Sequence, residues 1–107
     1  MGDQNEVAAP FASPGSLERG RLYVGVGPYD GQDEKYEIRI FDTNTWARVS
    51  TIRTSTPFVS AVATKDGSMI YAMTGQHGTI LAIDPVAQRQ LRAMPVGRAP
   101  SLALIAP

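Results

Sequence analysis

The sequence predicts an all-β protein assembled from repeated units of short antiparallel strands. From residue 21 onward, runs rich in β-branched and aromatic residues alternate with turn-forming segments, which is the pattern of strands and hairpins. The run Glu37–Asp42 (EIRIFD) returns 42 positions later as Thr79–Asp84 (TILAID). Repeats of about 40–45 residues that hold four strands are typical of β-propeller blades. We therefore predict a β-propeller fragment of about two four-stranded antiparallel blades.

Residues 1–20 stand apart from this pattern. They are rich in proline, glycine and polar groups, and they show neither the period of 2 of a strand nor the 3.6 of a helix. We expect a flexible, disordered leader over residues 1–20 and the two propeller blades over residues 21–107.

The first blade is expected to hold three strands, at Leu22–Val26, Glu37–Phe41 and Trp46–Ile52. The segment Gly27–Lys35 separates the first two and is a long polar loop, because it carries proline, an Asp-Gly pair and several charges. Asp42–Thr45 joins the next two, since these side chains can hydrogen-bond their own backbone in a turn.

The second blade is expected to hold four strands, at Phe58–Ala63, Met69–Met73, Thr79–Ile83 and Gln90–Val96. Its first two strands flank Asp66-Gly67, the strongest hairpin signal in the chain.

A single strand at Ser101–Ala106 completes a predicted pattern of three, four and one strands. The first blade then lacks its innermost strand, and the C-terminal strand is the candidate that closes a ring. A propeller needs about four to eight blades, so two cannot close alone. We expect the partners to be the remaining blades of a longer chain or copies of this one.

Composition excludes several classes of partner. The ten basic residues balance the ten acidic ones, so the chain has no basic surface for nucleic acid or anionic lipid. No apolar run approaches the 20 residues of a membrane span, and the N-terminus lacks the basic and apolar regions of a signal peptide. The absence of cysteine rules out thiolate metal sites and a cysteine nucleophile without deciding the compartment.

Candidate metal and acid–base residues are all better explained by structure. His77 is the only histidine and has no second histidine or cysteine to share a metal, so we interpret it as an exposed turn residue. Four carboxylates lack the ligand spacing of a calcium loop and indicate a solvated loop: Asp30, Asp33, Glu34 and Glu37. Asp42 and Asp84 recur at equivalent turns, which favours a capping role for each.

The remaining candidates also carry no chemistry. Gly25 and Gly27 are not followed by a helix or a Lys-Ser/Thr pair, so they do not form a phosphate loop. Three hydroxyl residues could serve as nucleophiles only beside a general base, and the sequence spacing indicates no such partner for them: Ser60, Thr64 and Ser101. Trp46 is expected to be a packing anchor between blades. The sequence thus predicts no catalytic, cofactor-binding or metal-binding residue.

Residues 21–107 contain a set of short motifs: Leu22-Tyr23-Val24, Ile38–Asp42 with Thr45 and Arg48, Ile70–Met73, Leu91-Arg92 and Gly97–Pro100. Together they resemble the C-terminal end of the heavy subunit of methylamine and related amine dehydrogenases. The spacing of the blades is shared with YVTN-type propellers in general, while the long first-blade loop and the Gly-Arg-x-Pro segment resemble this family more closely. The segment Asp84–Ala87 departs from the Asp-x-x-Thr-Gly turn usual in that family.

The resemblance implies a periplasmic, seven-bladed propeller subunit that pairs with a small light subunit. That enzyme oxidises primary amines to aldehyde and ammonia and passes electrons to a copper protein or a cytochrome. Its tryptophan tryptophylquinone cofactor is made from two tryptophans of the light subunit, whereas this chain has Trp46 alone. The resemblance therefore implies a non-catalytic scaffold and no cofactor in this chain.

Two alternatives remain open at the level of sequence. Copies of a self-standing module with no redox role would form a ring, in which three copies give six blades and four give eight. A truncated, non-functional fragment would leave sheet faces exposed and retain little core.

Overall fold

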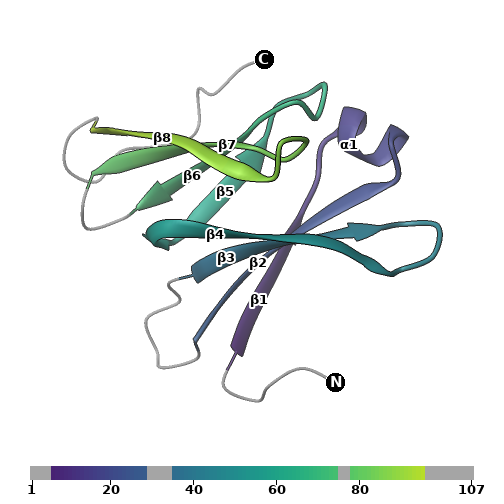
Figure 1. The fold of residues 1–107 in the computed structure, drawn as a ribbon, viewed down its shortest axis with the longest axis horizontal. Helices are drawn as coiled ribbons and strands as arrows, with labels where there is room; N and C mark the ends of the chain where they lie inside the picture. Colours follow the sequence, from purple (N-terminus) through teal and green to yellow (C-terminus); the bar gives the residue numbers. More distant parts are fainter. Residues whose placement is uncertain (1–5, 29–34, 75–77, 96–107) are drawn as a thin grey trace.

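The computed structural model describes residues 6–28, 35–74 and 78–95, and within them the chain forms two four-stranded antiparallel sheets (Figure 1). The sheet orders are β1-β2-β3-β4 and β5-β6-β7-β8, so that each sheet is a simple meander. The strands of the first sheet are β1 (Glu6–Phe11), β2 (Arg21–Pro28), β3 (Lys35–Asp42) and β4 (Arg48–Phe58). Those of the second are β5 (Ser60–Ala63), β6 (Ile70–Thr74), β7 (Thr79–Asp84) and β8 (Arg89–Pro95). The two predicted four-stranded antiparallel units are confirmed.

The N-terminal segment corrects the prediction of a disordered leader. β1 pairs with β2 in register from Glu6 opposite Pro28 to Phe11 opposite Tyr23. The first sheet therefore has four strands rather than the three predicted. β1 pairs with the edge of β2 at which a C-terminal closing strand was expected to pair. The unpaired backbone groups of β2 favour such a partner, and Pro10 is tolerated because β1 is an edge strand. The predicted strand Ser101–Ala106 lies outside the described residues.

A short helix, α1 (Pro14–Glu18), connects β1 to β2. It begins with a capping box: the Ser13 hydroxyl accepts a hydrogen bond from the Ser16 N–H (3.1 Å), and the Ser16 hydroxyl accepts one from the Ser13 N–H (2.9 Å). The cap satisfies backbone donors that a helix start leaves open. The sequence shows no helical period over these residues, so this helix is not expected from it.

Other boundaries shift by a few residues. The expected loop Gly27–Lys35 is shorter at both ends, because β2 continues to Pro28 and β3 begins at Lys35. The strand expected at Trp46–Ile52 begins at Arg48 and continues to Phe58, where the chain passes through Val59 into the second sheet. β4 is thus both the outermost strand of one sheet and the connection to the innermost strand of the next.

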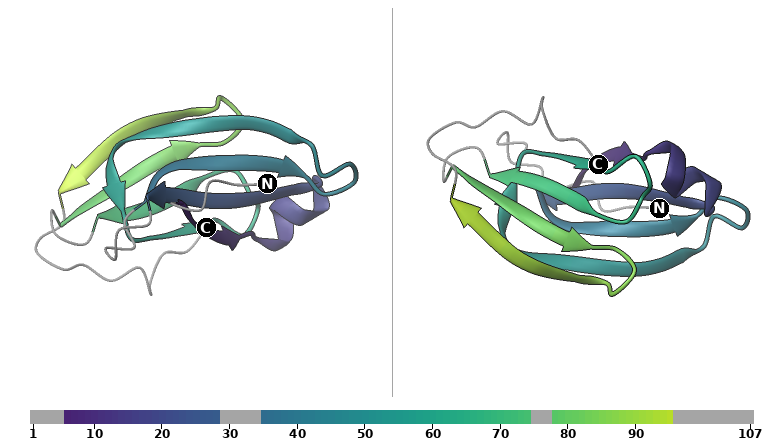
Figure 2. Two further views of the ribbon diagram at one scale, coloured as in Figure 1. Left: turned by 90° about the horizontal axis from the view of Figure 1, so that it is seen from below. Right: turned by 90° about the horizontal axis from the view of Figure 1, so that it is seen from above.

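The hydrophobic core lies between the two sheets. They are stacked in the same strand order, with β1 beside β5 and β4 beside β8 (Figure 2). Side chains alternate between the faces of each strand, so one face of each sheet supplies the core. The buried cluster comprises Tyr23, Ile38, Ile40, Ile52, Phe58, Ile70, Ala72, Leu81 and Ile83.

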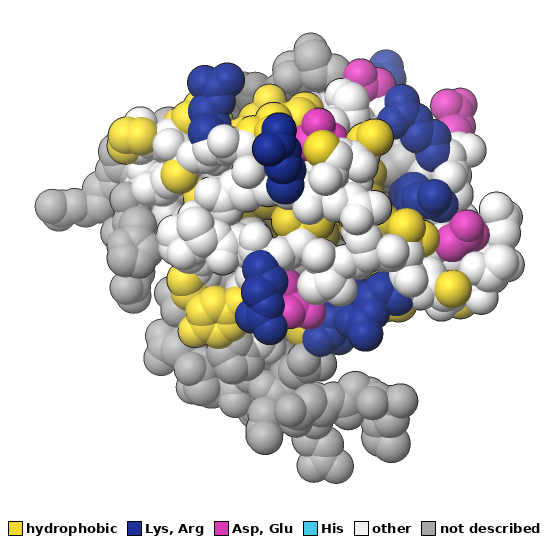
Figure 3. Space-filling model, in the orientation of Figure 1, with side chains coloured by type: hydrophobic (Ala, Val, Ile, Leu, Met, Phe, Trp, Pro, Cys, Tyr) yellow, Lys and Arg dark blue, Asp and Glu magenta, His cyan; other side chains and the backbone are white. Residues whose placement is uncertain are grey.

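Acidic and basic side chains are interspersed over the face seen in Figure 3. In the described segments, no helix has the length and apolar character that crossing a membrane requires.

Candidate functional site

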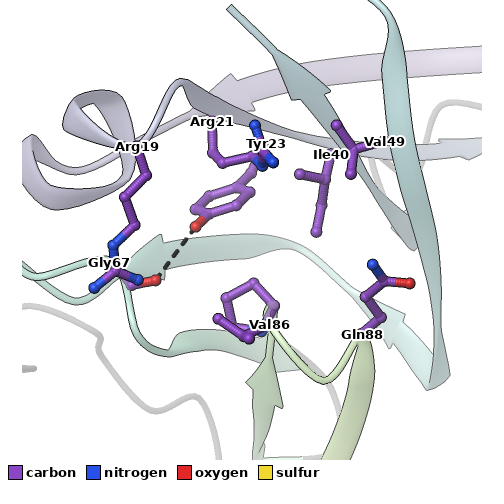
Figure 4. A pocket seen from close by; sticks show the side chains of 9 residues that line it. Arg19, Arg21, Tyr23, Ile40, Val49, Gly67, Val86 and Gln88 are labelled. Atoms are coloured by element: carbon purple, nitrogen blue, oxygen red, sulfur yellow. Dashed lines mark hydrogen bonds between the residues drawn. The ribbon is translucent and has the colours of Figure 1, made fainter.

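A cleft of about 240 Å³ opens between the two sheets (Figure 4). The first sheet contributes residues from β2, β3 and β4, the end of α1 contributes Arg19, and the second sheet contributes its β5–β6 and β7–β8 turns. The lining residues are Arg19, Arg21, Tyr23, Ile40, Val49, Gly67, Pro85, Val86 and Gln88. Because they come from distant parts of the chain, the cleft exists only after the sheets have packed.

The walls of the cleft are apolar. The Tyr23 ring lies at its centre, with Val86 across from it and with Ile40 and Val49 to one side. Tyr23 is 2% exposed, and its hydroxyl donates a long hydrogen bond to the Gly67 carbonyl oxygen (3.4 Å). Burial raises the pKa of the Tyr23 phenol, against a smaller opposite effect of the nearby Arg19 and Arg21 charges. The phenol is therefore protonated at neutral pH and remains a hydrogen-bond donor.

Two guanidinium groups stand at the cleft. Arg21 Nη1 lies 3.4 Å from Asp42 Oδ2 and 3.2 Å from the Gly20 carbonyl oxygen. The side chain of Arg19 makes no hydrogen bond or ion pair with any residue that the structure describes. Figure 4 shows Arg19 on the Gly67 side of Tyr23 and Gln88 on the opposite side. Arg19 also interacts electrostatically with the Asp66 carboxylate, so each of the two guanidinium groups has an acidic neighbour.

The two turn aspartates have the predicted capping role. Asp42 Oδ1 accepts hydrogen bonds from the N–H groups of Asn44 (2.7 Å) and Thr45 (3.2 Å), which lower the pKa of its carboxyl. Asp84 Oδ1 accepts equivalent bonds from Val86 (2.9 Å) and Ala87 (3.0 Å). The capping prediction is confirmed, and these carboxylates hold the β3–β4 and β7–β8 turns.

The Asp66-Gly67 hairpin is also confirmed. Asp66 Oδ1 accepts hydrogen bonds from the Thr64 hydroxyl (2.8 Å) and from the Ser68 N–H (3.0 Å), and Gly67 adopts a φ of 76°. Thr64, considered above as a nucleophile, is therefore part of this turn. Ser60 lies exposed on β5, and Gly25 lies within β2 rather than in a loop.

Glu37 and Trp46 differ from expectation. Glu37 belongs to β3, so it is not a loop residue. Its carboxylate forms an ion pair with Arg39 at 2.6 Å and a second one with Arg53 at 3.9 Å. The expectation that Trp46 anchors two blades is wrong, because its side chain is 63% exposed. Trp46 lies in the β3–β4 turn with a φ of 60°.

Several sequence candidates lie outside the described residues. These are His77, Asp30, Asp33, Glu34, Ser101 and the segment 97–100. Among the residues that are described, no group of three or more histidine, cysteine, aspartate or glutamate side chains is placed to hold a metal ion.

Sequence reasoning missed Arg19, Arg21 and Tyr23 as lining residues. Their spacing matches no motif, and Arg19 falls in the segment interpreted as a leader. For Tyr23 alone, the sequence held a signal: the alternation of side chains along β2 places the Tyr23 ring on the face of the sheet that packs in the core.

Comparison with solved structures identifies the fold. Hydrazine synthase from Kuenenia stuttgartiensis matches with a TM-score of 0.64 and 15% identity, over 86% of this chain and 24% of that chain. U3-55K matches with a TM-score of 0.64 and 13% identity, over 92% and 28%. Apo AztD from Citrobacter koseri matches with a TM-score of 0.56 and 18% identity, over 77% and 20%.

These proteins are propeller-like, which confirms the predicted β-propeller fragment, and the low identity restricts the likeness to the fold. The chain spans about a quarter of the length of the solved structures that it matches. No protein-family model and no curated protein sequence matches the chain.

Proposed function

We propose that this chain is a two-blade segment of a larger β-propeller and acts as a non-catalytic scaffold. The observation that carries the proposal is a recurrence of interface residues. The positions that bury the first sheet against the second reappear, one repeat later, on the outward face of the second sheet.

The equivalence is residue by residue. Ile38 and Ile52 are 0% and 2% exposed at the contact between the sheets, and their partners 42 positions later are Ile80 and Met94. Strand alternation places Ile80 on the face opposite that of the buried Leu81. Both Ile80 and Met94 are only partly buried there.

We define the open face as the outward face of the second sheet. Cross-strand pairing and alternation assign to it Val62, Tyr71, Met73, Ile80, Ala82, Arg92 and Met94. Because it repeats the residue types that bury the contact between the first and second sheets, the open face is suited to a third blade.

The outward face of the first sheet has a different character. Arg39, paired with Glu37 at 2.6 Å, stands at the repeat position of the fully buried Leu81. In a ring of identical copies, this ion pair would be covered by the open face of a neighbour. Burial of an ion pair is commonly about 1–4 kcal/mol less favourable than well-packed hydrophobic residues. This mismatch favours a distinct preceding blade from a longer chain over a ring of identical two-blade copies.

The finer proposal concerns the type of propeller. The motif resemblance described above supports the heavy subunit of a quinone-dependent amine dehydrogenase, located in the periplasm. In that case the partner is a light subunit that carries the tryptophan tryptophylquinone and oxidises primary amines, while the propeller positions it for an electron acceptor.

Native mass tests the scaffold proposal. We expect the full chain to associate without a fixed stoichiometry as its concentration rises in light-scattering chromatography, because the open face is unsatisfied. Ile80→Asp should shift the chain towards monomer, whereas Leu17→Asp, on the exposed surface of α1, should not. A monodisperse parent monomer at all concentrations would overturn the proposal, and a discrete trimer or tetramer would establish the self-assembling module instead.

A separate measurement tests the amine dehydrogenase proposal. The native mass is determined with and without a quinone-bearing light subunit of that enzyme class. Co-elution of the two chains is expected, and independent elution would overturn the amine dehydrogenase assignment while leaving the two-blade scaffold intact.

A further inference from the structure

The apolar run Leu102–Ala106, which lies outside the described residues, needs a partner other than the first sheet. Every residue of the run is apolar, and a short strand of this kind is typical of one that is covered on both faces. The partner expected from the sequence was the inner edge of β2. β1 already pairs with that edge, from Glu6 to Phe11.

The 42-residue repeat relates this run to β5, the innermost strand of the second sheet. Ser60–Ala63 corresponds to Leu102–Ile105, and the spacing from the preceding outer strand is also the same, because Ile52 and Met94 stand at equivalent positions. β5 follows β4 almost directly and lies beside β1, across the contact between the sheets (Figure 2). The equivalent place for the C-terminal run is beside β5, as the innermost strand of a third blade.

Alternation along β5 indicates which side chains of the run would face the second sheet. Ala61 and Ala63 pack against the core between the two sheets. Their repeat equivalents, Ala103 and Ile105, would therefore face the second sheet. Leu104 would face away from it, towards the side on which a further blade would lie.

The surface that would receive the run is the inner half of the open face, which consists of Val62, Tyr71 and Met73. All three side chains are partly buried, and the charged residue of the open face, Arg92, lies farther out on β8. In the contact between the two sheets, Ala61 borders a small hollow together with Phe11 and Gly25. Strand pairing makes Val62 and Met73 the equivalents of Phe11 and Gly25, so the inner half of the open face offers Ala103 a matching place.

We propose that Leu102–Ala106 docks on the inner half of the open face of its own chain, as the innermost strand of a third blade. The inference rests on the proposed scaffold, because it names the first occupant of the open face. The link from β8 matches the link from β4 in length, so the run reaches this surface at a high effective concentration without a second copy. One strand covers β5 and β6 only, so Ile80 and Met94 stay available and self-association is still expected.

Thiol labelling of the full chain tests the docking, because the chain has no native cysteine. Met73→Cys places one thiol on the inner half of the open face, and Met94→Cys places one on the outer half. Each variant is reacted with iodoacetamide at several low protein concentrations, and the rate is followed by mass spectrometry. We expect Ile105→Asp to raise the labelling rate of Met73→Cys at least about fivefold, because a carboxylate on the docked face would be buried without a partner. The rate of Met94→Cys should not change.

Leu104→Asp is the matched control. It adds the same charge at the neighbouring position, whose side chain faces away from the second sheet, so the labelling rate of Met73→Cys should change by less than about twofold. A general effect of charge or of unfolding would appear in both variants.

Three outcomes would overturn the proposal. The first is an unchanged labelling rate of Met73→Cys in the Ile105→Asp background, and the second is an equal or larger effect of Leu104→Asp. The third is protection that grows with protein concentration, which would identify a second copy as the occupant. These readouts do not involve native mass, so the docking can fail while the scaffold proposal stands.

Discussion

Gly15 lies directly against the backbone of Asp66, so closely that a Cβ atom on Gly15 would stand 2.2 Å from the Asp66 carbonyl carbon. The Gly15 N–H donates a hydrogen bond of 2.7 Å to the carbonyl oxygen of Lys65. Helix α1, which connects β1 and β2 of the first sheet, therefore packs against the β5–β6 turn of the second sheet (Figure 1). This contact joins the two sheets at the end where the cleft opens.

Gly15→Ala is expected to lower the free energy of unfolding by about 1–3 kcal/mol. The added methyl group meets backbone rather than the end of a flexible side chain, so α1 and the turn must separate. Chemical denaturation followed by circular dichroism measures the change. Leu17→Ala serves as the control within the same helix, and an unchanged denaturation midpoint in Gly15→Ala would contradict the docked arrangement.

Ser13→Ala is expected to cost about 1 kcal/mol of stability, the usual value for loss of an N-cap side chain. The Ser13 hydroxyl accepts the hydrogen bond from the Ser16 N–H, and both serines are buried, so solvent cannot replace it. Thermal unfolding of Ser13→Ala, Ser16→Ala and the double variant measures the coupling. Strictly additive effects would argue against a reciprocal cap.

Asp66 is expected to set part of the acid sensitivity of the fold. Hydrogen bonds from the Ser68 N–H, the Ser68 hydroxyl and the Thr64 hydroxyl lower the pKa of its carboxyl from 3.8 to about 2. A lowered native pKa means that the ionised carboxylate stabilises the fold above about pH 4, and that this contribution is lost as the pH falls from 3.8 to about 2. Denaturation midpoints measured from pH 5 to pH 2 in parent and Asp66→Asn should converge at the acid end.

Removal of one donor tests the cause of that behaviour. Ser68→Ala deletes a hydroxyl that lies 2.8 Å from Asp66 Oδ1 and leaves the backbone N–H in place. The native pKa of Asp66 should therefore move back towards 3.8, so the loss of stability in acid should be smaller in Ser68→Ala and should be complete at a higher pH than in the parent chain. If Asp66→Asn and the parent chain show the same pH profile over this range, the hydrogen bonds at Asp66 do not contribute to the acid response.

The fold was predictable where local chemistry and the repeat agree. Asp66-Gly67 encodes a hairpin in two residues, and Asp42 and Asp84 each cap a turn whose partners lie two and three positions away. The 42-residue spacing then relates the two sheets, because the same positions face the same side in each repeat. These signals depend on near neighbours or on periodicity, both of which a single sequence displays.

The parts that sequence reasoning missed depend on long-range contacts. β1 contains Ala8, Ala9 and Pro10, which are poor strand formers, and it is a strand because the edge of β2 is available for pairing. Likewise, Arg19 and Val86 line one cleft only because two sheets stack in register. No spacing rule relates residues that meet through tertiary packing.

The matched pair Ile38→Ala and Ile80→Ala separates the contact between the sheets from the open face. Ile38 is fully buried between the sheets, so its truncation should cost about 2–5 kcal/mol in the isolated chain. Ile80, its repeat equivalent, is only partly buried, so the same truncation should cost less than half as much while reducing self-association. Denaturation midpoints and sedimentation of both variants provide the two readouts. Equal destabilisation by the two substitutions would mean that Ile80 is already part of a packed core, and the open face would then have no need of a third blade.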